Sequence, residues 1–259
     1  MGTAVVRLIA ESSGVQLAGV ATEAGHPRLG EDAGTVAGTR ALDVAIGSSV
    51  AAAVAGCDVA IDFSSVAAFD HHLEACVAVG CGLVVGTTGL SDVQSAHLEV
   101  AARQIPVVYG RNMSVGVLVF QELARIAARH LGSEADIEII ETHHRNKVDA
   151  PSGTALQLGE AVAAELGHRL EDVAAFGRFA ASEPRRQGTI GFSSVRAGNV
   201  VGDHDIQFAL AEEIVTLSHR ALDRATFARG ALRAARWRGG RPPGLYSMAD
   251  VLGIGGPGR

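Results

Sequence analysis

Hydrophobic positions fall into two kinds of run along the first part of the chain. Short and nearly continuous apolar runs predict strands, whereas runs with an apolar side every third or fourth residue predict helices. The predicted strands are 15–20, 58–63, 83–85 and 105–109, and the predicted helices are 3–11, 66–79 and 92–103. A glycine-rich connection occupies 25–47. Apolar strands separated by helices indicate a parallel sheet that is covered on both faces.

The pattern changes after residue 113. A long amphipathic helix is predicted over 115–131, a strand over 136–142 and a second helix over 154–166. Three further strand-like runs have no helices between them, which predicts an open mixed or antiparallel sheet; they are 189–195, 205–210 and 213–218. A helix over 224–237 and a short apolar tail at 248–252 follow. We therefore expect an α/β chain with two different sheets.

Composition limits the classes of function. The 259 residues are 47% hydrophobic, which is enough for one large or two modest cores. The net charge of −6 argues against a general nucleic-acid binder, and neither a membrane-spanning run nor a signal peptide is recognised. Cys57, Cys76 and Cys81 lack metal-site spacing and are typical of small apolar residues in a reducing cytosol. We expect a cytoplasmic protein with no metal, nucleic-acid or membrane partner.

The densest run of reactive side chains is 141–154, which reads ETHHRNKVDAPSGT and contains the only lysine of the chain, Lys147. A guanidinium group stays protonated, whereas an ammonium group can be tuned to release a proton. One lysine among many arginines is explained equally well by compositional drift. The neighbours of Lys147 are what favour a function.

Two histidines lie where the predicted strand ends, and a helix start follows them. His143 and His144 can reach one ligand only if the strand has ended, because successive strand residues point to opposite faces. Gly153 and Thr154 open the next helix, whose free N–H groups and dipole favour an anion. Histidine transfers protons near neutral pH. The alternative is a solvated cationic turn, but with Lys147 the combination favours a pocket for a small carboxylate substrate.

Two small polar loops follow predicted parallel strands. They are Gly86-Thr87-Thr88-Gly89 and Gly110-Arg111-Asn112-Met113. Ligands of open α/β sheets bind beyond the carboxyl ends of the strands, and glycines would let a flat ring approach the backbone. The first loop taken alone is explained equally well as an ordinary turn.

Residues 141–155 resemble the signature of the dihydrodipicolinate reductase family, whose members are also called 4-hydroxy-tetrahydrodipicolinate reductases. The signature is long and specific, and supporting matches run through nearly the whole chain. These matches are 29–34 (LGEDAG), 61–64 (IDFS), 86–89 (GTTG), 112–116 (NMSVG), 188–192 (GTIGF), 195–198 (VRAG), 201–204 (VGDH) and 248–252 (MADVL).

The resemblance implies a Rossmann-type parallel-sheet domain over 1–113 plus 219–259. It also implies an inserted α+β domain over 114–218, with an open mixed sheet, for substrate binding and tetramerisation. The implied activity is hydride transfer from NADH or NADPH to a small cyclic dicarboxylate on the diaminopimelate route to lysine, carried out by a homotetramer.

The resemblance also assigns roles residue by residue. His143 and Lys147 correspond to proton donors, His144 to a substrate contact, and Gly153 and Thr154 to a cradle for a substrate carboxylate. The cofactor would be held by Gly86, Thr87 and Thr88 on one loop and by Gly110, Arg111, Asn112 and Met113 on the other. No metal is implied.

The chain departs from the family pattern at its start and at the ribose position. The family begins with a strand and a glycine-rich loop, of which Met1-Gly2 resembles only the last two residues. We expect the neighbouring strands to lose backbone partners and the natural protein to be longer, with a truncated, inactive product as the alternative. The ribose position falls on Thr22 or, with a shift of one, on Glu23; no arginine follows, which favours NADH.

Two rival functions stay open at this point. One is a related nicotinamide enzyme acting on another small carboxylate, such as an amino-acid dehydrogenase. The other is a dicarboxylate-binding protein that has lost its cofactor site.

Overall fold

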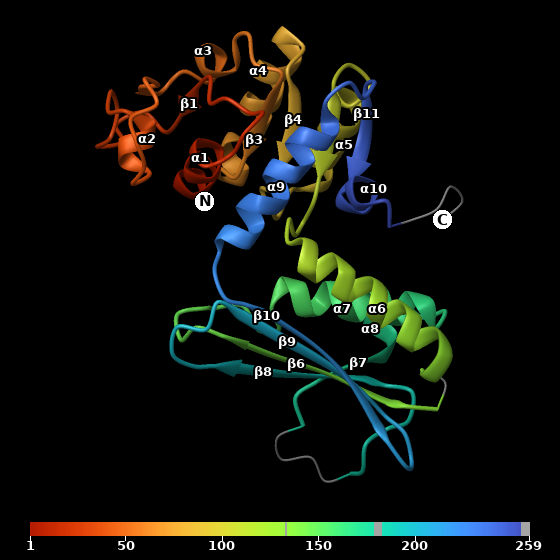
Figure 1. Cartoon of the computed structure of the whole chain (residues 1–259). Helices are drawn as coiled ribbons and strands as arrows, with labels where there is room; N and C mark the ends of the chain where they lie inside the picture. The colour runs from red at the N-terminus through yellow and green to blue at the C-terminus, as the bar shows by residue number, and fades with distance from the viewer. Residues whose placement is uncertain (133, 179–182, 255–259) are drawn as a thin grey trace. The chain divides into compact units, whose positions relative to one another are not determined.

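The computed structural model describes residues 1–132, 134–178 and 183–254 (Figure 1). The chain divides into two compact units, of which the first comprises Met1–Val115 and Ala225–Arg259 and the second comprises Gly116–Arg224. The chain therefore leaves the first unit once and returns to it at the end.

The first unit is built on parallel strands. Its main sheet has four strands in the order β11-β5-β4-β3, all parallel. These strands are β3 Val59–Asp62, β4 Gly82–Val85, β5 Pro106–Tyr109 and β11 Gly244–Ser247. The last strand of the chain thus pairs with β5, so the C-terminal segment completes the sheet of the N-terminal one.

Helices surround these strands. They are α1 Gly2–Ala10, α2 Ala33–Val36, α3 Val50–Val54, η1 Val66–Ala68, α4 Phe69–Val79, α5 Asp92–Ala101, α9 Ala225–Arg238 and α10 Met248–Leu252. The start of α5 is set by a capping box, in which the Ser91 side chain accepts from the Gln94 N–H and the Gln94 side chain accepts from the Ser91 N–H. One core cluster lies between the central strands and the helices α4 and α5, around Phe69, Leu83 and Leu98.

A second parallel pair is separate from this sheet. It joins β1 Val20–Ala21 to β2 Ile46–Gly47. The strand predicted over 15–20 is therefore wrong in its bounds. Among the described residues, β1 pairs only with β2, and β3 pairs only with β4. A strand with one neighbour forms backbone hydrogen bonds along one edge only, so fewer bonds stabilise its extended conformation. The helices α2 and α3 and the strand β2 were not predicted.

The second unit is a mixed sheet with helices on one face. The sheet order is β10-β9-β6-β8-β7; β6, β8 and β7 run parallel, whereas β9 is antiparallel to both β6 and β10. The elements are α6 Val115–Leu131, β6 Asp136–His143, α7 Gly153–Glu165, α8 Leu170–Val173, β7 Ala174–Phe176, β8 Ile190–Arg196, β9 Gly202–Ala209 and β10 Ile214–Ala221. The predicted open mixed sheet is confirmed; β7 and α8 were not predicted.

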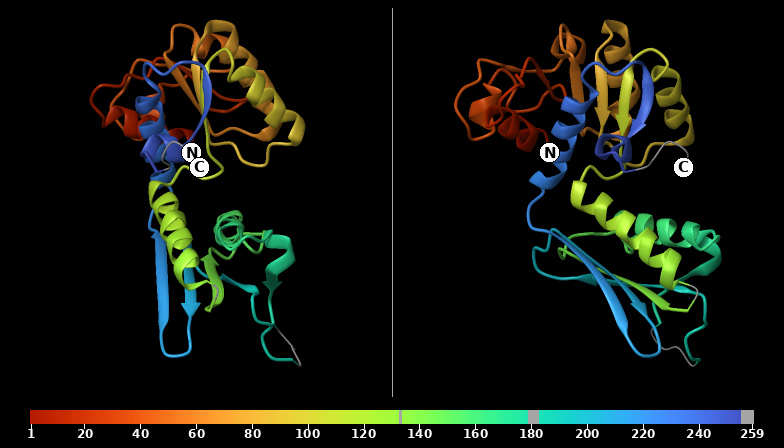
Figure 2. Two further views of the ribbon diagram at one scale, coloured as in Figure 1. Left: turned by 90° about the vertical axis from the view of Figure 1, so that its right-hand side faces the viewer. Right: turned by 45° about the vertical axis from the view of Figure 1, so that its right-hand side comes forward.

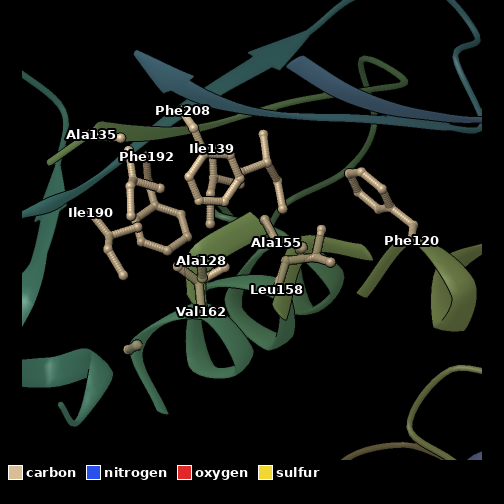
Figure 3. Packing of buried hydrophobic residues seen from close by; sticks show 14 residues of the cluster. Phe120, Ala128, Ala135, Ile139, Ala155, Leu158, Val162, Ile190, Phe192 and Phe208 are labelled. Atoms are coloured by element: carbon tan, nitrogen blue, oxygen red, sulfur yellow. The ribbon is translucent and has the colours of Figure 1, made fainter. Parts of the chain in front are cut away.

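The core of the second unit lies between its sheet and the helices α6 and α7, which cover the same face (Figure 2). Ile139, Phe192 and Phe208 project from the strands toward Leu158 and Val162 of α7 (Figure 3). Side chains alternate between the two faces of a strand. On β6 the covered face therefore carries Ile137 and Ile139 and then, toward the end of the strand, Glu141 and His143. The apolar core gives way to ionisable groups at that end.

Gly230 of α9 is packed too tightly for any side chain. A Cβ at this position would lie 1.7 Å from the carbonyl oxygen of Met113. Replacing an exposed glycine in a helix by alanine usually raises the free energy of unfolding of the protein by up to about 1 kcal/mol. We expect the opposite sign for Gly230→Ala, a loss of about 1–3 kcal/mol in the free energy of unfolding, because the loop at Met113 must move. Chemical denaturation of this variant measures the loss. Gly2→Ala on α1, where a Cβ meets nothing within 4 Å, is the control. An unchanged or higher stability of Gly230→Ala would contradict this packing.

Candidate active site

A buried carboxylate and an imidazole lie side by side at the end of β6. Glu141 is 1% exposed, and its Oε2 lies 2.5 Å from Nδ1 of His143. An ionised carboxylate can only accept a hydrogen bond, so Nδ1 of His143 carries the proton of this bond. The other ring nitrogen, Nε2, is then the one that can exchange a proton.

Arg196, on the neighbouring strand β8, holds the same carboxylate. Its Nη1 donates to Oε2 of Glu141 at 2.8 Å and its Nη2 to Oε1 at 2.7 Å. Burial acts to raise the pKa of Glu141, but hydrogen bonds from Arg196, His143 and Ser194 outweigh it and bring that pKa to about 2. Glu141 is therefore ionised throughout the physiological range.

Ser152 connects this carboxylate to the start of α7. Its N–H donates to Oε1 of Glu141 at 3.2 Å, and its hydroxyl oxygen accepts from the N–H of Ala155 at 3.2 Å as the N-cap of the helix. The same hydroxyl lies 3.1 Å from Nε2 of His204 on β9. Burial first, and then the nearby His143, lower the pKa of His204 to about 4, so this second histidine is neutral at pH 7.

The first turn of α7 is suited to an anion. The first N–H groups of a helix have no partner within it, and the helix dipole adds partial positive charge there. Gly153 is exposed and a Cβ on it would meet nothing within 4 Å, so the backbone is open to a ligand. Thr154, half-buried, follows it. A carboxylate group of a small ligand fits these donors.

Lys147 and His144 lie in the turn between β6 and α7. The Nζ of Lys147 lies 2.8 Å and 2.9 Å from the two carboxylate oxygens of Asp149, and this contact lowers the pKa of Asp149. The charge of Lys147 also helps to lower the pKa of His143, although burial contributes most. The described hydrogen bonds thus join Lys147 to Asp149, while His143 is joined to Glu141 and, through it, to α7. His144 is half-buried, and its carbonyl accepts from the Lys147 N–H at 3.1 Å.

Four residues of this site were not predicted from the sequence: Glu141, Ser152, Arg196 and His204. The signal for Glu141 was present, since it stands two residues before His143 on a predicted strand and thus shares its face. Arg196 and His204 are brought to the site by strand pairing, in which His143 pairs with Arg196 and Glu141 with His204. No sequence spacing reveals such a register.

In the first unit, the loop at 86–89 follows β4 and is fastened to the end of β3. The Thr87 hydroxyl donates to the Ser64 carbonyl at 3.3 Å and lies 3.5 Å from a carboxylate oxygen of Asp62. Thr87 is buried and Thr88 is exposed, so Thr88 is the hydroxyl that can meet a ligand. A Cβ at Gly86 would lie 2.2 Å from the Phe63 ring. This glycine is therefore required by local packing.

Asp62 is the centre of a small polar cluster beneath that loop. It accepts from the Ser64 N–H at 2.7 Å and lies 3.1 Å from Nδ1 of His72. The Ser64 hydroxyl approaches the same nitrogen of His72 at 3.2 Å. A nucleophilic triad needs both ring nitrogens, one toward the serine and one toward the acid. The cluster therefore supports the loop and is no hydrolytic triad.

The second loop, 110–113, follows β5. The Gly110 N–H donates to the Val85 carbonyl at 3.2 Å, and the Asn112 side chain accepts from the Ser114 N–H at 2.8 Å. Arg111 is exposed, whereas Met113 is buried against Gly230. Both loops thus lie at the carboxyl ends of adjacent parallel strands, the position at which such sheets bind ligands.

The residues present fit a nicotinamide dinucleotide. Helix α1 begins at Gly2 without an acidic residue in its first turn, and the space around Gly2 is open, which suits a phosphate group. Thr22 and Glu23 follow β1, where the Thr22 N–H donates to the Gly47 carbonyl at 2.9 Å and the Glu23 side chain is exposed. Within the described ranges, no group of three or more His, Cys, Asp or Glu residues is arranged to hold a metal ion. None of the described helices has the length and hydropathy of a membrane span.

Two family models cover nearly the whole chain. The one described as dihydrodipicolinate reductase, N-terminus, matches residues 1–113, and its C-terminal counterpart matches residues 116–252. The chain belongs to the dihydrodipicolinate reductase family. Membership confirms the resemblance of 141–155 and of the shorter motifs, and it makes the chain an oxidoreductase that uses NADH or NADPH.

Individual relatives agree with this family. The 4-hydroxy-tetrahydrodipicolinate reductase of Anaeromyxobacter dehalogenans is 48% identical over 99% of this chain and 95% of that protein. The protein of the same name from Alkalilimnicola ehrlichii is 47% identical over 98% of this chain and 95% of that protein. No comparison supports the rival interpretation of a dicarboxylate-binding protein without a cofactor.

Solved structures share the fold. A dipicolinate-bound dihydrodipicolinate reductase from Paenisporosarcina sp. TG-14 superposes with a TM-score of 0.75 at 20% identity, covering 96% of this chain and 94% of that one. An amine dehydrogenase from Mycobacterium smegmatis has a TM-score of 0.60 at 13% identity, covering 95% and 92%. At these identities the similarity concerns the fold alone.

Proposed function

We propose that this reductase converts 4-hydroxy-tetrahydrodipicolinate to tetrahydrodipicolinate in lysine and diaminopimelate biosynthesis. The substrate loses its hydroxyl group as water and gains a hydride and a proton. The observation that carries the proposal is the imidazole of His143, held by Glu141 and joined through Ser152 to the first turn of α7. A proton donor and a site for a carboxylate are thereby fixed to one another.

In this proposal the two units bind different ligands. The first unit binds the dinucleotide, with Gly86, Thr87 and Thr88 on one loop, Gly110 to Met113 on the other, and Thr22 or Glu23 toward the ribose. The bound cofactor supplies the hydride. The second unit binds the substrate through His144, Gly153 and Thr154.

His143 and Lys147 supply protons in this proposal. Hydride addition to a conjugated C=N system leaves an electron-rich atom, and a nearby acid lowers the barrier by protonating it. Lys147 must leave Asp149 to act, and a substrate carboxylate is the natural competitor for its ammonium group. A dicarboxylate also raises the pKa of His143, because negative charge favours the imidazolium form. The bound substrate therefore favours the protonated form of His143, which is the form that can donate.

We further propose a homotetramer in the cytoplasm. Among the described residues, no helix covers the sheet face opposite α6 and α7, where Val195 and Ile214 are exposed at 45% and 62%. A second subunit could pack against this uncovered face. Light scattering after gel filtration tests the subunit number. The free thiols of Cys57, Cys76 and Cys81 suit a reducing compartment.

Coupled turnover tests the proposed reaction. The substrate is made in situ by the preceding synthase, and the loss of absorbance at 340 nm is followed with NADH and with NADPH. We expect oxidation that depends on the synthase product and a higher kcat/KM with NADH, because Glu23 is acidic and no arginine neighbours it to meet a 2′-phosphate. Turnover with other small carboxylates but not with this product would favour the first rival function.

A further inference from the structure

We propose that Glu141 is a positioning residue of the reductase: it fixes the ring and tautomer of His143 and ties that ring to the first turn of α7. The inference rests on the proposed role of His143 as a proton donor. In this proposal Glu141 contacts neither substrate nor cofactor and acts through its hydrogen bond to His143.

The burial of Glu141 requires an explanation. An ionised carboxylate away from water is costly unless it is paired and hydrogen-bonded. Oε2 receives His143 at 2.5 Å and Arg196 at 2.8 Å, while Oε1 receives Arg196 at 2.7 Å and the Ser152 N–H at 3.2 Å. Each carboxylate oxygen thus accepts a hydrogen bond from Arg196 and another from His143 or Ser152. Arg196 neutralises the charge, while the hydrogen bonds from His143 and from the Ser152 N–H hold the histidine and the start of α7.

Among the described contacts, a second glutamate of β6 forms ion pairs without contacting the proposed site residues. Glu138 lies three residues earlier on β6 and points to the opposite face of the sheet. It forms ion pairs with Arg185 at 3.1 Å and with Arg178 at 2.8 Å. Its side chain is 23% exposed, against 1% for Glu141. Glu138 contacts none of the proposed site residues in the described hydrogen bonds, which makes it a matched control.

The tautomer of His143 follows from Glu141. With Nδ1–H bound to the carboxylate, the proton exchanged with substrate is the one on Nε2. Gly202 leaves that nitrogen room, because a Cβ at 202 would lie 3.0 Å from Nε2. Without the carboxylate, the neutral ring could place its proton on either nitrogen, and the ring would lose its strongest orienting contact.

Glu141 also affects the pKa of His143, and its effect is opposite to that of the other neighbouring charges. Within the described part of the chain, the titratable and charged groups that act on the ring are Glu141 on β6, Arg196 on β8, His204 on β9 and Lys147 in the turn after β6. Burial, Lys147 and Arg196 lower the pKa of His143, while Glu141 raises it. Removing the charge of Glu141 therefore lowers the pKa further and leaves less of the protonated donor at neutral pH.

The kinetic test replaces the charge and keeps the shape. We expect Glu141→Gln to lower kcat by about 10²-fold, within the range that a positioned acid contributes, and to move the fall of kcat with rising pH to a lower pH. The KM for the cofactor should stay unchanged. Glu138→Gln should retain near wild-type kcat and pH dependence. A kcat for Glu141→Gln within about threefold of wild type, with an unmoved pH profile, would overturn the proposal.

A spectroscopic test needs no variant at the glutamate. Nitrogen-15 NMR of histidine-labelled enzyme, with the His143 signal assigned by its loss in His143→Gln, reports the neutral tautomer. We expect the proton on Nδ1; a proton on Nε2 would overturn the assignment even if Glu141→Gln fails to fold. Wild-type turnover by His143→Ala would reject the proposed acid itself, whereas its loss together with an unaffected Glu141→Gln would reject only the positioning role.

Discussion

His143→Ala is expected to reduce kcat by about 10²- to 10⁴-fold, the contribution usual for a positioned general acid. The affinity for NADH or NADPH should change little, because the proposed cofactor loops belong to the first unit and His143 to the second. Steady-state kinetics and fluorescence titration of the cofactor separate the two effects. His130→Ala, at an exposed histidine of α6 in the same unit, is the control. Loss of cofactor binding with normal turnover at saturation would show that the role is wrong.

The pH dependence of the wild-type enzyme follows from the same residue. A proton donor must be protonated, so activity falls as pH rises through its pKa. Burial lowers the pKa of His143 below its usual value, so kcat/KM, which reports the free enzyme, should fall at a correspondingly low pH. The dicarboxylate raises that pKa in the complex, so kcat should persist to a higher pH. Coincident pH profiles would contradict this electrostatic account.

Lys147→Arg is expected to lose most of the turnover, roughly tenfold or more in kcat, although the charge is preserved. A guanidinium group does not release a proton in proteins, whereas it can replace the ammonium group at Asp149. The KM for the substrate should therefore change less than kcat. Arg145→Lys, at an exposed position in the same turn, should behave like wild type. Unchanged turnover by Lys147→Arg would mean that this lysine contributes charge alone.

The sequence predicted the elements that carry the site with useful accuracy. The strand expected over 136–142 is β6, which ends at His143, and the helix expected over 154–166 begins at Gly153. Both predictions rested on local signals, the strand-like apolar run and the helix start at Gly153 and Thr154. The start of α5 at the Ser91 cap is likewise set by residues close in sequence.

Elements that depend on distant partners were predicted less well. The strand expected over 15–20 shrinks to Val20–Ala21, because its length depends on neighbours that no local pattern specifies. The contacts of Glu141 with Arg196 and of Ser152 with His204 likewise join residues 55 and 52 positions apart. Register across β6, β8 and β9 places Arg196 and His204 beside the end of β6, and register is a property of the folded sheet.

We expect the end of β6 and the start of α7 to bind one ring with two carboxyl groups and to protonate it. A crystal structure of this chain with a nicotinamide cofactor and pyridine-2,6-dicarboxylate tests it most directly. We expect one carboxylate of the ligand within hydrogen-bond distance of the N–H groups of Gly153 and Thr154, with Nε2 of His143 facing the ring. A ligand bound away from α7, with His143 turned from it, would contradict the account.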